Sequence, residues 1–104
     1  MTISANDITR DTHSINACYS INGVGYNNEV DTNGYNLASV VADMVDFWND
    51  HESMAEPFEV AKMVEVDGDI EVTIEGKVYG FLDGVQDESR MDTIDIIINA
   101  TPKA

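Results

Sequence analysis

The sequence predicts an α+β domain in which one amphipathic helix packs on a mostly antiparallel sheet of five or six strands, in the order ββαβββ(β). Two strand-like segments precede one segment with helical periodicity, and three or four strand-like segments follow it. Regular alternation of helices and strands, the mark of a doubly wound parallel sheet, does not occur. The 104 residues match one domain, 1–104, with 1–13 and 100–104 expected to be loosely ordered.

The first two strands are predicted to form a hairpin around an Asn-Gly turn. Apolar and polar residues alternate from Ile15 to Ile21, as in a strand with one buried face. Asn22-Gly23 then supplies the positive φ angles of a two-residue turn. The register expected from this turn opposes Ile21 to Val24, Tyr19 to Tyr26, Ala17 to Asn28 and Ile15 to Val30.

The helix is predicted to run from an N-cap at Asn36 to about Asp50. Asp43, Asp46 and Asp50 fall on the face that is expected to meet solvent. The opposite face is apolar and is expected to pack in the core; it consists of Leu37, Val40, Val41, Met44, Val45 and Trp48.

A second hairpin is predicted after the helix. Glu56-Pro57 is expected to interrupt the chain before a strand from Phe58 to Val66, with an irregularity near Ala61 and Lys62. A three-residue turn over 67–69 is preferred to a two-residue turn. It opposes apolar residues, Val66 to Ile70 and Val64 to Val72, and it leaves Glu65 facing Glu71.

The last part of the chain is expected to contain two further strands. Gly76-Lys77 is predicted to turn into a short strand from Val78 to Leu82, and a polar loop follows from Asp83 to Arg90. Alternating isoleucines between Ile94 and Ile98 predict the final strand.

Charge is the most unusual property of the sequence. Twenty carboxylates face five Lys and Arg, for a formal net charge of -15. The scattered basic residues argue against direct binding of nucleic acid or of an anionic membrane. Cys18 has no cysteine partner in the chain, and the first residues lack the pattern of a signal peptide, so a cytoplasmic location is expected.

Candidate catalytic groups are few. His13 and His51 lack a nearby nucleophile in sequence, and Cys18 is more consistent with a partly buried small residue than with a nucleophile. Asp67, Asp69 and Glu71 resemble an incomplete set of metal ligands. We therefore expect no enzyme activity, metal or cofactor, and an enzyme that recruits a metal through carboxylates is a distant alternative.

Acidic residues gather in the middle of the sequence. From Asp43 to Glu75 there are eleven acids and one base, Lys62. A solvated surface or adaptation to high salt is the plain alternative to a binding role. The residues predicted to bind a partner are Asp43, Asp46, Asp50, Glu52, Glu59, Glu65, Asp67, Asp69, Glu71 and Glu75.

In size, charge and folded acids such as Asp43 and Glu75, the chain resembles a class of small acidic proteins of phages and mobile elements. These proteins imitate nucleic acid and block basic sites on host defence complexes, and they include anti-CRISPR and anti-restriction proteins. The resemblance implies that the chain, as a monomer or homodimer in the host cytoplasm, binds a basic surface of a CRISPR effector or restriction nuclease. The alternative is an immunity or antitoxin protein that caps a toxic nuclease.

Overall fold

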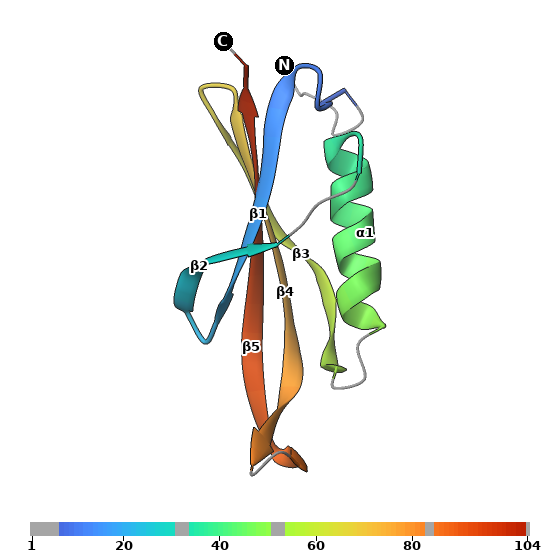
Figure 1. Ribbon diagram of the computed structural model, residues 1–104, viewed down its shortest axis with the longest axis vertical. Helices are drawn as coiled ribbons and strands as arrows, with labels where there is room; N and C mark the ends of the chain where they lie inside the picture. The colour runs from blue at the N-terminus through green and yellow to red at the C-terminus, as the bar shows by residue number, and fades with distance from the viewer. Residues whose placement is uncertain (1–6, 31–33, 51–53, 83–84, 104) are drawn as a thin grey trace.

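The computed structural model describes residues 7–30, 34–50, 54–82 and 85–103. One helix lies against a five-stranded antiparallel sheet with the spatial order β2-β1-β5-β4-β3 (Figure 1), which confirms the predicted α+β class. The elements are β1 (His13–Ile21), β2 (Val24–Val30), α1 (Leu37–Asn49), β3 (Met54–Val66), β4 (Asp69–Leu82) and β5 (Val85–Pro102). The molecule is elongated, 48 × 23 × 22 Å, because β4 and β5 form one long hairpin.

The first hairpin forms at Asn22-Gly23, with positive φ angles at both residues and Ile21 opposite Val24 as predicted. Beyond that pair the predicted register is wrong. Tyr19 lies opposite Asn28 and Ala17 opposite Val30, because β2 has two more residues than β1 between the paired positions. Such a bulge increases local twist, and Figure 1 shows β2 crossing the long strands steeply.

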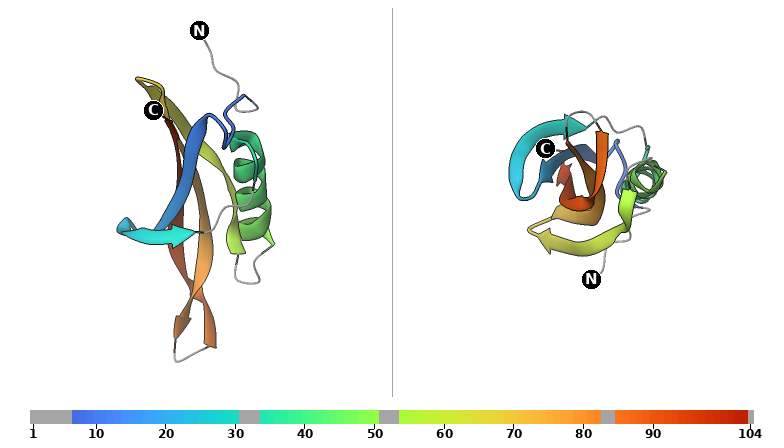
Figure 2. Two further views of the ribbon diagram at one scale, coloured as in Figure 1. Left: turned by 45° about the horizontal axis from the view of Figure 1, so that its top comes forward. Right: turned by 90° about the horizontal axis from the view of Figure 1, so that it is seen from below.

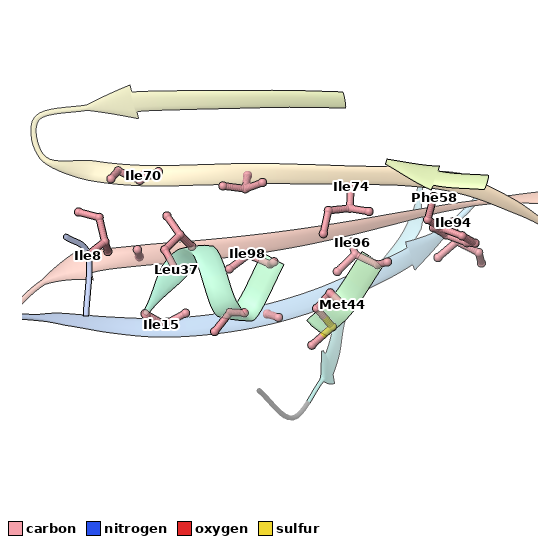
Figure 3. Packing of buried hydrophobic residues seen from close by; sticks show 14 residues of the cluster. Ile8, Ile15, Leu37, Met44, Phe58, Ile70, Ile74, Ile94, Ile96 and Ile98 are labelled. Atoms are coloured by element: carbon pink, nitrogen blue, oxygen red, sulfur yellow. The ribbon is translucent and has the colours of Figure 1, made fainter. Parts of the chain in front are cut away.

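Helix α1 begins and ends where the sequence predicts. The Asn36 side chain accepts a hydrogen bond from the Ser39 amide at 2.8 Å, which caps the first turn. Leu37, Val40 and Met44 are buried. They meet the isoleucines of β4 and β5 in a single core (Figure 3), and Val41, Val45 and Trp48 pack at its margin. Figure 2 shows α1 and β2 on opposite sides of the long strands.

The segments next to the core at the two ends of the chain are more closely packed than the sequence predicts. Ile8 is 1% exposed, its carbonyl accepts a hydrogen bond from the Leu37 amide at 2.8 Å, and Thr9 forms an isolated bridge with Asn36. Ala100 is fully buried within β5. Burial in the apolar core accounts for the packing at both sites, and the sequence pattern in these polar stretches does not indicate it.

Strand β3 contains Pro57, so the predicted interruption at Glu56-Pro57 is wrong. The strand is at the edge of the sheet, where a residue without an amide hydrogen is tolerated. The pairing passes from Glu56–Lys77 to Glu59–Glu75, so Pro57 and Phe58 together oppose Gly76. This bulge accommodates the proline without ending the strand.

The second hairpin has a two-residue turn, so the predicted three-residue turn is wrong. Asp67 and Gly68 both have positive φ, and Val66 pairs with Asp69. The physical reason is a second bulge: pairing shifts between Val60 and Lys62, at the predicted irregularity. An extra residue there reverses the alternation of faces, so the pairs expected across the three-residue turn do not form.

Strand β4 continues through Gly76-Lys77 without the predicted turn. It pairs with β5 along its whole length, from Ile70 opposite Ala100 to Leu82 opposite Val85. The polar segment predicted as a loop is therefore largely strand, apart from a register shift between Tyr79 and Gly80. Asp83 and Gly84 lie outside the described residues.

Candidate functional site

The helical acids lie on the side of α1 that faces away from the core. Asp43, Asp46 and Asp50 are all exposed. Steps of three and four residues correspond to a rise of about 4.5–6 Å between neighbours. We call this group the helix acids. The structure brings these three predicted residues together on one surface.

A second acidic group lies on the opposite face of the sheet. Ile70, Val72 and Ile74 of β4 point into the core under α1, so the alternating Glu71 and Glu75 point to the outer face. Glu59 of β3 is directly opposite Glu75. We call Glu59, Glu71 and Glu75 the sheet acids. Helix α1 covers the other face of the sheet (Figure 2), so the helix acids and the sheet acids form two separate surfaces.

The remaining predicted binding residues belong to neither group. Glu65 pairs with Ile70 instead of Glu71, which places it on the helix side of the edge strand. Asp67 is in the turn, and Asp69 begins β4, so both lie at the tip of the hairpin. Glu52 lies outside the described residues.

Asp95 is an outer-face acid that the sequence analysis missed. It pairs with Glu75 on one side and with Ser20 on the other, so Glu59, Glu75, Asp95 and Ser20 form a row across four strands. Among the side chains that the structure describes, Asp95 Oδ1 and Ser20 Oγ are buried and have no hydrogen-bond partner. The position of Asp95 between the alternating core residues Ile94 and Ile96 is a sequence signal that indicates the outer face.

Crowding in this row changes the titration of Glu75. A hydrogen bond to the Asp95 carboxyl, followed by repulsion from its charge and then by desolvation, raises the pKa of Glu75, while Lys77 opposes the shift. Lys77 Nζ lies 3.4 Å from Glu56 Oε2. The raised pKa means that ionising Glu75 costs more free energy in the folded state than in the unfolded chain, so the charged form destabilises the fold at neutral pH.

Replacing Glu75 with glutamine is expected to stabilise the protein at pH 7. An exposed like-charge cross-strand pair costs about 0.2–1 kcal/mol, and the exposure of Glu75 favours the low end. Because the folded pKa of Glu75 is raised, the protein loses stability as pH rises and Glu75 ionises. At pH 5 less of this loss has occurred, so the stability gained by Glu75→Gln should be smaller than at pH 7. Urea unfolding at both pH values measures this. Glu65→Gln is the matched control, and an equal gain in it would assign the effect to net charge alone.

The candidate catalytic groups do not assemble into a reactive site in the described part of the chain. Burial, followed by the charge of Glu71, raises the pKa of Cys18, which keeps the thiol protonated and weakly nucleophilic. His13 Nδ1 lies 2.8 Å from the Thr12 hydroxyl at an exposed position. His51 lies outside the described residues. Of the side chains described, no three from His, Cys, Asp or Glu are arranged to hold a metal ion.

Comparison of this chain with known protein families, curated proteins and solved structures gives no relative from which a function can be transferred. No protein-family model matches the sequence, and neither a curated protein nor a solved structure matches it at a significant level. Among the helical residues that the structure describes, no segment is both long and apolar enough to cross a membrane. The two acidic surfaces are therefore the features of this chain that bear on its function.

Proposed function

We propose that the protein is an acidic binding protein that mimics nucleic acid and blocks the basic nucleic-acid-binding site of a host defence complex, such as a CRISPR effector or a restriction nuclease. The observation that carries the proposal is the fixed spacing of carboxylates on regular elements. The helix acids are exposed along one helix, and Glu59, Glu75 and Asp95 are neighbours across three paired strands.

These spacings are compatible with a surface that normally contacts phosphates. Paired strands lie about 4.8 Å apart, and the helix acids rise about 4.5–6 Å per step. Phosphates along one nucleic-acid strand rise about 3.4 Å per step, with a lateral displacement in addition. A folded scaffold also holds its carboxylates without the loss of entropy that a disordered acidic tail would suffer on binding.

Two triple variants with equal charge change test the proposal. Asp43→Asn/Asp46→Asn/Asp50→Asn neutralises the helix acids, and Glu59→Gln/Glu71→Gln/Glu75→Gln neutralises the sheet acids. Association with a panel of purified CRISPR effectors and restriction nucleases is measured by biolayer interferometry at 50 and 200 mM salt. We expect one triple to weaken binding at least tenfold, mainly through slower association, and the other to change it less than threefold.

The two triple variants remove the same number of charges, so a difference between their affinities cannot come from net charge alone. Nucleic acid should compete with the protein for the same site, and affinity should fall steeply with salt. The proposal is wrong if no member of the panel binds at 50 mM salt, or if both triples bind like the unchanged protein. Binding to a single toxic nuclease encoded beside this protein would instead support an immunity function.

A further inference from the structure

Strand β3 is an edge strand that exposes apolar side chains on both of its faces. The bulge near Ala61 places Val60 and Met63 on the helix side, opposite Ile74 and Val72. Val60 and Met63 are 48% and 49% exposed. On the outer face Val64 and Val66 are also exposed. Edge strands of soluble proteins usually avoid such a surface, because it invites pairing with another chain.

A groove lies between this edge and α1. Ala38, Val41 and Ala42 form its helical wall, and Val60 and Met63 form its strand wall. Its volume is about 290 Å³. Enclosed apolar cavities of about 150 Å³ hold benzene, so the groove has room for an aromatic or long aliphatic side chain. The two alanines, one helical turn apart, leave this space open.

Charge and backbone geometry identify the kind of occupant. The net charge of -15 disfavours a second copy of this chain. The outer face beside β3 carries Glu59, Glu71 and Glu75 against Lys62. The free edge of β3 at the end of the sheet offers main-chain groups to an extended segment, which would present alternate side chains to the groove and to the sheet acids.

We propose that β3 binds an extended segment with alternating apolar and basic residues from the basic partner protein. The segment adds a strand to the sheet, its apolar side chains enter the groove between α1 and β3, and its Lys or Arg side chains face the sheet acids. This inference rests on the proposed function and adds to it the contact that selects one basic protein among many. Charge complementarity gives fast association and rejects acidic partners. The groove adds discrimination among basic surfaces, because only a segment with apolar side chains at alternate positions can fill it.

The probe is a seven-residue peptide of alternating Lys and Leu, blocked at both ends. The control peptide has Gln in place of Leu and the same charge. In ¹⁵N-HSQC titrations we expect the Leu peptide to shift the amides of residues 59–66 and those of Ala38, Val41 and Ala42. Titration calorimetry should show at least tenfold weaker binding of the Gln peptide.

Two separate variants test the groove without changing charge. Met63→Gln and Val60→Thr should each weaken binding of the Leu peptide about three- to tenfold, and both sites are exposed enough for the fold to persist. Val85→Thr, at the far end of the β4–β5 hairpin, should leave affinity unchanged. Equal affinity for the two peptides, or shifts confined to the helix acids, would overturn the inference.

The peptide experiment tests the docking surface, and the panel of defence complexes tests the proposed function, so either hypothesis can be overturned while the other stands. Weaker binding of the Leu peptide by Met63→Gln, with no panel member binding the unchanged protein, would support the docking surface and overturn the proposed function. The opposite result is salt-sensitive binding to a panel member with the same affinity in Met63→Gln, Val60→Thr and the unchanged protein. It would support the proposed function and overturn the docking surface.

Discussion

Replacing Phe58 with alanine is expected to lower the free energy of unfolding by about 3–5 kcal/mol. Phe58 is 2% exposed, and its ring centroid lies 5.3 Å from that of Trp48. The ring therefore joins the edge strand to the end of α1. Urea unfolding followed by circular dichroism measures the loss, which is a large part of the roughly 5–15 kcal/mol that stabilises a domain.

Gly76 lies against the Phe58 ring, so a substitution at residue 76 tests whether the loss in Phe58→Ala comes from this contact. A Cβ at residue 76 would lie 2.6 Å from the Cδ atoms of the Phe58 ring, so Gly76→Ala should cost about 1–3 kcal/mol through overpacking. In the Phe58→Ala background the added methyl has space, and its cost should disappear or change sign. Additive costs in this double-mutant cycle would contradict the predicted contact.

Gly80→Ala is a control in the same strand. An added Cβ there would lie 3.2 Å from Arg90 Cβ, a looser contact than the one that a Cβ at residue 76 would make with the Phe58 ring. Its effect should be below about 1 kcal/mol and independent of residue 58, because the site is remote from the ring. The comparison separates the contact with Phe58 from the general effect of replacing glycine by alanine in a strand.

The parts of the fold that the sequence predicts are those governed by local signals. The helix follows from its apolar periodicity and from the Asn36 cap, and the first turn follows from Asn22-Gly23. Strand registers depend on the bulges in β2, β3 and β5, and the alternation of apolar residues does not reveal how many residues a bulge inserts. The turn at Asp67-Gly68 has two residues and not the predicted three, because the bulge near Ala61 reverses the alternation of β3 before the turn.

The candidate site shows the same division. The acidic residues are evident in the sequence, and the helix acids follow from helical spacing. Their division between two opposite surfaces depends on which sheet face α1 covers, and no local pattern contains that information. The groove between α1 and β3 could not be predicted, because its two walls are separated in sequence and its strand wall exists only after the bulge shifts Met63 toward the helix.

Replacing Asn49 with alanine is expected to lower the free energy of unfolding by about 2–6 kcal/mol. Its side-chain Oδ1 accepts from the Phe58 amide at 2.6 Å, and its Nδ2 donates to the Phe58 carbonyl at 3.0 Å. Phe58 lies in the bulge opposite Gly76 and has no directly paired residue in β4, so this side chain replaces a strand partner. Losing it leaves two main-chain groups of a buried residue unpaired, at about 1–3 kcal/mol each.

Hydrogen exchange distinguishes this role from a general loss of helix stability. In Asn49→Ala the Phe58 amide should exchange faster relative to the amides of β4, whereas uniform destabilisation would accelerate both. Phe47→Ala is the matched control in the last turn of α1, because Phe47 is 63% exposed and its loss should cost less than about 1 kcal/mol. Unchanged protection of the Phe58 amide in Asn49→Ala would show that the helix and the edge strand are joined by the packing of Phe58 and Trp48 alone.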